Sequence, residues 1–157
     1  MVTKTLPMEL LEQKGLPYQA HHHDEPKYTA EGVAEDLGIP VSRVVKAMLV
    51  RCDGGWYVLV VIPGDRRLSL EKVQSTVGAD SVNLASKQQV ERITGYTVGA
   101  VSVMGFRQGG VLTFVDKGVL ELDQVIISSG RPDAGLSLST EDLMAALEGP
   151  QVGDFCE

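Results

Sequence analysis

Residues 44–62 read VVKAMLVRCDGGWYVLVVI, which is two apolar runs separated by four residues of turn composition. The runs 44–51 and 56–62 are rich in β-forming residues, and the intervening CDGG favours a tight turn, so the pattern predicts a β-hairpin. Because both strands are almost wholly apolar, we expect them to lie centrally in a sheet with both faces covered. Lys46 is a charge within this apolar row and needs an explanation of its own.

Capping residues predict five helices around this hairpin. Each begins near a Pro, Thr or Ser and ends at a Gly, as helix termini commonly do. Two of the starts, Ser86 with Gln89 and Ser139 with Asp142, have the spacing of a capping box. The expected helices run from near Pro7 to Gly15, from Thr29 to Gly38, from Ser69 to Gly78, from Ser86 to Gly95 and from Ser139 to Gly149.

The remaining segments predict further strands and one long loop. Extended structure is expected at 17–20 and just before Ser69, and full strands at VLTFVD and ELDQVIISS, residues 111–116 and 121–129. Residues 96–110 alternate small residues and glycines without a helical period and are expected to form a structured loop with short strand pieces. Strands and helices do not alternate strictly, so we expect a mixed α/β (α+β) fold with a mixed, partly barrel-like sheet flanked by helices. No linker or repeat interrupts it, so residues 1–157 are expected to form a single domain.

The composition restricts the classes of function. The 157 residues include 14 Lys and Arg against 21 Asp and Glu, a formal charge of −7, which argues against indiscriminate nucleic-acid binding. No apolar run approaches the roughly 18 residues that span a bilayer, and the N-terminal segment lacks the apolar core of a signal peptide. We therefore expect a soluble, cytoplasmic, monomeric protein with no membrane partner. Neither a dinucleotide-binding GxGxxG nor a P-loop motif occurs.

Cysteines and histidines offer two further candidate sites. Cys52 and Cys156 are expected to be free thiols, the first in the polar hairpin turn and the second in a mobile tail, and a nucleophilic Cys52 would need a nearby histidine. The run His21 to Glu25 has ligand types suited to zinc, but adjacent residues of an extended chain point to opposite sides. At most two of the three histidines can converge, so no metal cofactor is expected and a solvated loop with one functional histidine is favoured.

Three segments have both a structural and a functional interpretation from the residues alone. Lys46 is either a strand-end residue whose ammonium reaches water or a cation in a cleft that holds a phosphate or polarises a carbonyl. Gly95, Gly99 and Gly105, with Ser102, are either a tight connection or a loop that offers backbone N–H groups to a carbonyl oxygen or a ribose hydroxyl. Residues 128–130 are either a polar strand end or a wall of the same pocket.

Several ordered motifs add a family resemblance that runs from about residue 6 to residue 148. The sequence resembles the YbaK/EbsC family of aminoacyl-tRNA deacylases, which is related to the editing domain of bacterial prolyl-tRNA synthetases. The resemblance implies a barrel-like mixed fold and hydrolysis of the ester that joins a wrong amino acid, usually cysteine or alanine, to the 3′ end of tRNA(Pro). It is carried by the segments 28–51, 58–73, 92–105, 125–130 and 139–143.

The resemblance also implies roles for individual residues. Lys46 matches the family's strand lysine, which grips the terminal phosphate or the substrate carbonyl. The segment 99–103 matches a Gly-x-x-x-Pro loop that lines the pocket with main-chain donors. The implied catalytic residues are Lys46, Gly99 and Ser102, and the implied substrate-binding residues are His21, Ala100, Val101, Ser128, Ser129 and Gly130.

Three positions depart from the family pattern. The loop proline is Val103 here, a tyrosine near His21 is absent, and an aspartate near Gly135 is absent. Substrate identity therefore cannot be transferred from the resemblance. These departures also motivate an alternative, a catalytically inactive module of the same fold that binds a tRNA end or a synthetase, and a histidine-rich metal-binding domain is a third reading.

The sequence therefore predicts a trans-editing hydrolase that needs no cofactor. An aminoacyl ester is already activated, so the site needs only to orient it, shelter it and stabilise the oxyanion. The expected partners are the CCA end of a mischarged tRNA and, because an acidic surface limits tRNA contact, a synthetase that delivers it. The cations considered for the tRNA end, besides Lys46, are Arg43, Arg66, Arg67, Arg92 and Arg107.

Overall fold

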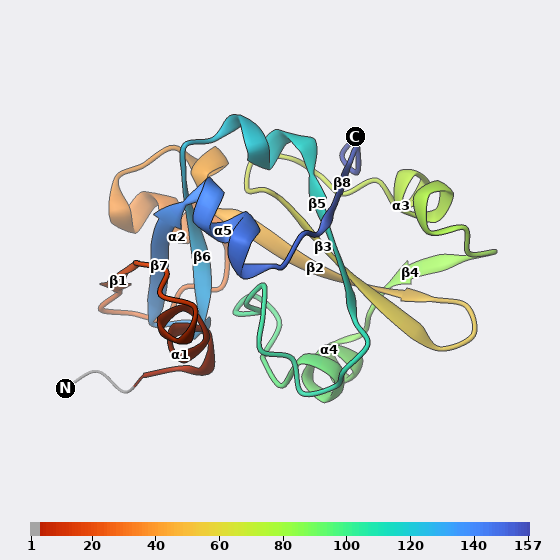
Figure 1. Ribbon diagram of the computed structural model, residues 1–157, viewed down its shortest axis with the longest axis horizontal. Coiled ribbons are helices and arrows are strands. Elements are labelled where there is room, and N and C mark those ends of the chain that lie inside the picture. Colours follow the sequence, from red (N-terminus) through yellow and green to blue (C-terminus); the bar gives the residue numbers. More distant parts are fainter. Residues whose placement is uncertain (1–3) are drawn as a thin grey trace.

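Within residues 4–157, the architecture consists of two β-sheets and five α-helices (Figure 1). The structure is a computed structural model that describes residues 4–157, so the first three residues of the predicted domain 1–157 lie outside the described part. One sheet has three strands in the order β1-β7-β6, and the other has five in the order β4-β2-β3-β5-β8. None of the helices in the described range has the length and apolar character needed to cross a membrane.

The helices and strands are bounded as follows. The helices are α1 (Leu6–Gln13), α2 (Ala30–Leu37), α3 (Leu70–Val77), α4 (Lys87–Thr94) and α5 (Thr140–Ala146), with two 3₁₀ turns, η1 (Val41–Arg43) and η2 (Lys117–Glu121). The strands are β1 (Gln19–His22), β2 (Val45–Cys52), β3 (Trp56–Pro63), β4 (Val82–Leu84), β5 (Leu112–Asp116), β6 (Gln124–Arg131), β7 (Ala134–Ser139) and β8 (Gln151–Gly153).

The predicted hairpin is present as β2 and β3, which pair antiparallel from Val45 opposite Pro63 to Cys52 opposite Trp56. Gly54 adopts a positive φ in the turn, which explains the glycine there. After Trp56, every residue of β3 is buried, as expected for a central strand covered on both faces. Because β3 also pairs parallel with β5, the sheet is mixed, and the predicted fold class is confirmed.

Helix caps are also largely as predicted. The side chains of Thr29, Ser69, Ser86 and Ser139 each accept a hydrogen bond from a backbone N–H in the first turn of the helix that follows. At Ser86 the bond is reciprocated by Gln89, which completes the capping box. These starts are recognisable in the sequence because a cap uses residues only three apart.

The strands form two sheets where the sequence predicted a mixed, partly barrel-like sheet. The two sheets are joined by a single parallel bridge between Val44 and Ile126. Strand β6 pairs with β7 instead of extending the larger sheet, and a register shift between Ser128 and Arg131 bends their hairpin. The cavity described below is lined by residues of both sheets.

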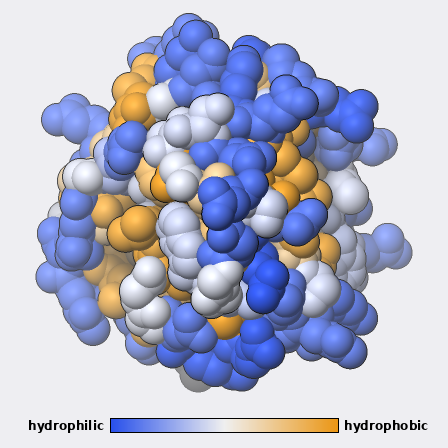
Figure 2. All heavy atoms as spheres, turned by 90° about the vertical axis from the view of Figure 1, so that its right-hand side faces the viewer, coloured by the Kyte–Doolittle hydropathy of each residue, from blue (hydrophilic) through white to orange (hydrophobic). Residues whose placement is uncertain are grey.

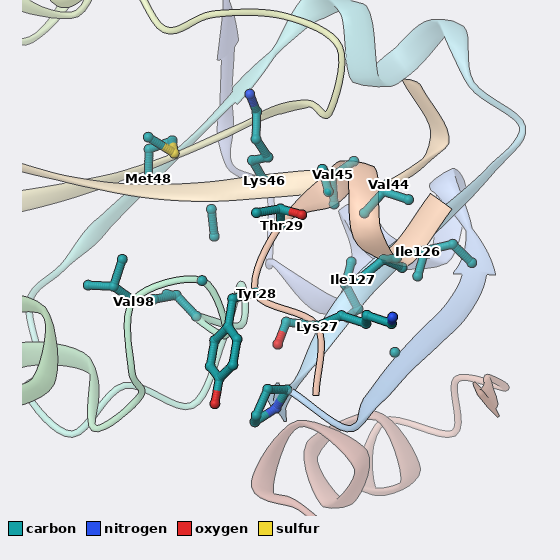
Figure 3. Close-up of a pocket in the computed structure, with 18 of the residues that line it drawn as sticks. Lys27, Tyr28, Thr29, Val44, Val45, Lys46, Met48, Val98, Ile126 and Ile127 are labelled. Atoms are coloured by element: carbon teal, nitrogen blue, oxygen red, sulfur yellow. The ribbon is translucent and has the colours of Figure 1, made fainter. Parts of the chain in front are cut away.

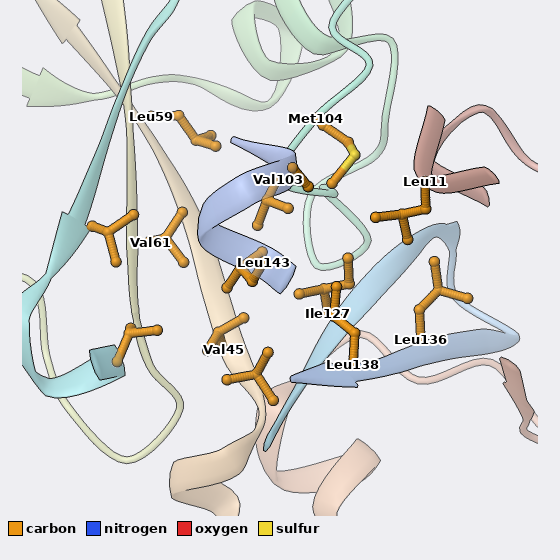
Figure 4. Close-up of a cluster of buried hydrophobic side chains, with 14 of the residues drawn as sticks. Leu11, Val45, Leu59, Val61, Val103, Met104, Ile127, Leu136, Leu138 and Leu143 are labelled. Carbon is orange, nitrogen blue, oxygen red and sulfur yellow. The ribbon is translucent and has the colours of Figure 1, made fainter. Parts of the chain in front are cut away.

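The principal core lies between the two sheets (Figure 4). Leu143 of α5 is fully buried there, between Val61 of the larger sheet and Leu138 of the smaller one. Helix α5 therefore separates the sheets on one side and fixes their spacing through close packing.

Several elements were missed or misassigned by the sequence analysis. Strands β4, β7 and β8 were not predicted. β4 and β8 have only three residues each, too few to show a period, and the alternation of Leu and Ser at 136–139 in β7 was overlooked. The loop at 96–110 contains no strand. Cys156 is fully buried and bridges to Leu68, so the prediction of a mobile tail was wrong, and Cys52 is likewise fully buried as the last residue of β2 rather than part of a polar turn.

Candidate active site

A cavity of about 380 Å³ lies where the two sheets meet (Figure 3). Its walls come from β2, from the β6–β7 hairpin, from residues 27–31 before and within α2, and from the glycine loop, the name used here for residues 95–105. Most of the lining is aliphatic, with few polar groups, which is the usual character of a small-molecule site. Of the sequence-predicted residues, the lining includes Lys46, Gly99, Val101 and Ser128.

Lys46 borders this cavity as the second residue of β2, near the open end of the hairpin and opposite Ile62. Its Nζ donates a hydrogen bond to the Arg66 carbonyl oxygen at 2.7 Å. In Figure 3 the ammonium points away from Tyr28 and Val98, toward the turn after β3. An ammonium has three donors, so the bond to Arg66 occupies one and leaves two for another partner.

Gly99 is required by a close approach between the glycine loop and the segment before α2. Its φ is +88°, and a Cβ at this position would lie 2.5 Å from the Tyr28 carbonyl oxygen and 2.8 Å from the Tyr28 Cβ. Real Cβ atoms do not approach backbone oxygens so closely, so only glycine fits without displacement of Tyr28. The contact therefore fixes the distance between two walls of the cavity.

Ser102 and Ala100 support the loop from behind and are not part of the cavity lining. The Ser102 hydroxyl, fully buried, donates to the Ser128 carbonyl oxygen at 2.7 Å. In return the Ser128 hydroxyl donates to the Ala100 carbonyl oxygen at 3.1 Å and accepts from the Gly130 backbone N–H at 3.0 Å. The structure thus places the predicted catalytic Ser102 in a bond that holds the loop against β6.

Ser129 and Gly130 also lie outside the lining, near the end of β6 and just before the turn to β7. The buried Ser129 hydroxyl donates to the Ala134 carbonyl oxygen at 2.7 Å. Gly130 packs under the ring of Tyr96, where a Cβ would lie 2.7 Å from the ring. The Tyr96 hydroxyl donates to the Met104 carbonyl oxygen, and burial raises the pKa of this phenol to about 12.

The three histidines do not converge. His21 borders a separate, smaller cavity, where its Nε2 lies 2.9 Å from the Ser137 hydroxyl, and it is not part of the lining described above. His22 is exposed, and His23 is buried against Asp36. Within residues 4–157 no group of three or more His, Cys, Asp or Glu side chains is placed to hold a metal ion.

Two other positions that depart from the family pattern, 103 and 135, lie in different surroundings. Val103 is buried in the principal core, so the position anchors the loop rather than facing the cavity. Gly135 does line the cavity, and a Cβ there would lie 3.1 Å from the Ile126 side chain. A larger residue at 135 would narrow the cavity.

The cations at the cavity are not those that the sequence suggested. None of Arg43, Arg66, Arg67, Arg92 and Arg107 lines it, whereas Lys27 and Arg131 do. Arg131 forms a two-pronged pair with Asp133, at 3.1 and 2.9 Å, and this hydrogen-bonded guanidinium lowers the pKa of the Asp133 carboxyl. Lys27 follows Pro26 in the segment before α2, and nothing in the composition of that segment marked it as a site residue.

Large apolar side chains surround the mouth of the cavity, and sequence reasoning missed them as well. Tyr28, Leu84 and Val98 all contribute to the lining, and each is about half exposed. Figure 2 shows hydrophobic residues emerging between hydrophilic ones on the side of the molecule that carries β4. An aromatic ring beside an apolar opening can stack on a nucleobase.

Comparison with known proteins agrees with this geometry. Residues 24–146 match the family described as "Aminoacyl-tRNA editing domain". The chain belongs to this family. The predicted resemblance to YbaK/EbsC-type deacylases is thereby confirmed, because the family match covers most of the chain and relatives bear deacylase and trans-editing names.

Individual relatives fall into two groups. The chain is 28% identical over 148 residues to a protein of Enterococcus faecalis named "Putative Cys-tRNA(Pro)/Cys-tRNA(Cys) deacylase EbsC", covering 93% of this chain and 90% of that protein. It is also 28% identical over 130 residues to the proline–tRNA ligase of Pelobacter propionicus, covering 79% of this chain but only 22% of the ligase.

Solved structures share the fold over almost the whole chain. A crystal structure of the hypothetical protein APE2540 superposes with a TM-score of 0.88 and 32% identity, covering 95% of this chain and 97% of that one. A structure described as a "putative trans-editing enzyme for prolyl tRNA synthetase" superposes with a TM-score of 0.86 and 26% identity, covering 96% and 94%.

Proposed function

We propose that this member of the editing family hydrolyses the ester of mischarged aminoacyl-tRNA in trans, with cysteinyl- or alanyl-tRNA(Pro) as substrates. The observation that carries the proposal is the small aliphatic cavity bordered by Lys46 on one side and the glycine loop on the other. The name of the E. faecalis relative supports the cysteinyl substrate.

The chemistry needs little from the protein. Water attacks the ester carbonyl carbon and supplies the proton for the ribose oxygen as the bond to that oxygen breaks. Where a ribose hydroxyl or the cysteine thiol attacks first, the resulting ester or thiolactone is hydrolysed by water in a second step. The amino acid and a free tRNA hydroxyl are released. Lys46 would stabilise the charge that develops on the carbonyl oxygen or hold the terminal phosphate, since two of its three N–H donors remain after the bond to Arg66.

Selectivity would come from the size of the cavity. Contacts with the wall of a pocket discriminate between two amino acids by only about 1–3 kcal/mol per methylene group. A separate editing site that is too small for the larger, correct amino acid therefore adds selectivity that the first site lacks. Gly135 keeps this editing site open because it carries no side chain toward Ile126. A small aminoacyl group then fits where a larger one does not.

Recognition of the tRNA would be confined to its end. With a net charge of −7, the chain has little capacity to neutralise phosphates, and binding by a few cations is weak and sensitive to salt. Lys27 and Lys46 at the cavity suffice for a CCA end. Delivery by a synthetase, with prolyl-tRNA synthetase as the first candidate, follows from this limit.

A deacylation panel tests the proposal. Cysteinyl-, alanyl- and seryl-tRNA(Pro) are incubated with wild type, with Lys46→Ala and with Lys87→Ala, a matched control at an exposed lysine of α4. We expect Lys46→Ala to reduce kcat/KM by about 100-fold, the usual effect of removing one oxyanion donor, and Lys87→Ala to match wild type. Release of none of these amino acids by wild type would rule the proposal out, and tRNA binding without turnover would select the inactive-module alternative.

A further inference from the structure

The His23 imidazole carries an unpartnered nitrogen beside the cavity. Its side chain is only 1% exposed, and Nδ1 lies 2.6 Å from the Asp36 Oδ2. The other ring nitrogen, Nε2, is buried and has no hydrogen-bond partner among the described residues, a property it shares there only with the Thr5 hydroxyl oxygen. Buried polar atoms are nearly always paired, so an unpaired one needs an explanation.

The position of this nitrogen supplies the explanation. His23 is one of the residues that line the cavity. Its Nε2 would lie 3.9 Å from a Cβ at Gly135, and Gly135 lines the same wall. The unpaired nitrogen therefore borders the part of the cavity that stays open because residue 135 has no side chain. The neighbouring wall residues Ile126 and Ala134 have no polar side-chain atom to offer it.

Asp36 determines what kind of partner the nitrogen accepts. A carboxylate oxygen accepts hydrogen bonds, so the 2.6 Å contact with Asp36 Oδ2 favours the tautomer with its proton on Nδ1. In the neutral ring Nε2 is then an acceptor, and the pairing fixes both the tautomer and the ring orientation. Its missing partner is an N–H or O–H donor that enters the cavity.

We propose that His23 Nε2 accepts a hydrogen bond from an N–H or O–H of the aminoacyl group, and that Asp36 is the positioning residue that orients it. This rests on the proposed function, and it goes further by assigning the cavity a side-chain contact to the amino acid itself. The donor is the α-amino group or a side-chain hydroxyl. A ligand without a donor at this point leaves the buried nitrogen unpaired and binds less well.

Two amide substitutions, each of which replaces one ring nitrogen, distinguish contact with the aminoacyl group from a purely structural role. In His23→Asn the amide nitrogen takes the place of Nδ1, so the bond to Asp36 is retained and the acceptor is lost. In His23→Gln the amide takes the place of Nε2, so an acceptor is retained and the bond to Asp36 is lost. The proposal predicts that kcat/KM is higher for Gln than for Asn, with Asn about 10-fold below wild type, the usual effect of one lost hydrogen bond. The thermal midpoint should show the reverse order.

Alanyl- and seryl-tRNA distinguish the two donors. If His23→Asn slows both substrates equally, the α-amino group is the donor, and if it slows the seryl substrate alone, the side-chain hydroxyl is. Values of kcat/KM that follow the thermal midpoints, with Asn above Gln, would indicate a purely structural pair and overturn the proposal. Wild-type rates in both variants would overturn it as well.

A binding measurement keeps this test separate from the test of hydrolysis. Calorimetry with the non-hydrolysable amides 3′-alanylamino-3′-deoxyadenosine and its seryl counterpart reads the same contact without turnover. If wild type releases no amino acid but Gln still binds an amide more tightly than Asn does, the proposed function fails and the His23 contact stands. Failure of wild type to bind either amide, or equal affinity of the two variants, would refute the contact.

Discussion

The hydroxyl groups of Ser102 and Ser128 hold the glycine loop against β6, because each donates a hydrogen bond to a backbone carbonyl oxygen of the other segment. The Ser102 hydroxyl donates to the Ser128 carbonyl oxygen, and the Ser128 hydroxyl donates to the carbonyl oxygen of Ala100 in the same loop. The loop contains no strand, so these bonds replace the ladder that would otherwise hold it. The cavity wall at Gly99 and Val101 thus depends on two hydroxyl groups that bond to backbone carbonyl oxygens.

Ser102→Ala should loosen this wall. The substitution leaves the Ser128 carbonyl oxygen without its side-chain partner, which costs about 1–3 kcal/mol at a buried site. We expect urea unfolding to show this loss, and kcat/KM for deacylation to fall with it. Ser75→Ala, at an exposed position of α3, is the control and should leave both unchanged. An unchanged unfolding free energy for Ser102→Ala would show that the bond does not hold the loop.

Gly99→Ala should damage the site by displacing Tyr28. The positive φ alone costs alanine about 1–2 kcal/mol, and the clash with the Tyr28 carbonyl oxygen adds about 1–3 kcal/mol. Gly110→Ala separates the two effects, because Gly110 has a φ of +84° and nothing near its missing Cβ. We expect Gly110→Ala to lower stability modestly and leave deacylation intact, whereas Gly99→Ala lowers both. Equal effects of the two substitutions would argue against the contact with Tyr28.

Tyr96 should make stability sensitive to alkaline pH. Burial raises the pKa of its phenol from 10.0 to about 12, so the folded state favours the neutral form. The contribution is fully present below about pH 10, where the unfolded phenol is still neutral, and is lost as pH rises toward 12. Urea unfolding of wild type and Tyr96→Phe across this range should show a stability difference that shrinks with pH. Phenolate absorbance should show a late-titrating group that Tyr96→Phe lacks.

The two thiols should be unreactive in the native state. Cys52 and Cys156 are fully buried, and burial raises the pKa of both thiols, to about 12 for Cys156. Because the thiolate is the reactive form, we expect a chromogenic disulfide reagent to label neither cysteine at neutral pH within minutes. In about 6 M guanidinium, which unfolds the protein, both thiols should react as fast as exposed cysteines do. Single variants assign any labelling to one thiol, since Cys156→Ser retains only Cys52 and Cys52→Ser retains only Cys156. Rapid labelling of either native variant would contradict the burial of the remaining thiol and would show which part of the molecule opens.

Local signals predicted much of the fold and part of the site. The β2–β3 hairpin and the caps at Thr29 and Ser86 were predictable because each uses residues that are close in the sequence. Lys46 and Gly99 were placed at a pocket by resemblance, and the structure does bring them to one cavity.

Other features of the site could not be found in this way. His23 was one of three neighbouring histidines, and what distinguishes it is its pairing with Asp36 on α2 and its position beside β7, which only the folded chain supplies. Tyr28 likewise becomes a site residue through its contact with Gly99, 71 positions further along by the numbering. Tertiary contacts of this kind leave no periodic pattern in a single sequence.

The single bridge between Val44 and Ile126 has a consequence for how amino-acid preference can change. The two sheets share one backbone bridge and otherwise meet through side chains of the core, where Leu143 lies between them and sets their separation (Figure 4). The width available to the aminoacyl group is therefore governed from the core as well as from the cavity wall. We expect descendants of this chain to acquire new substrates by exchanging residues that no substrate ever touches.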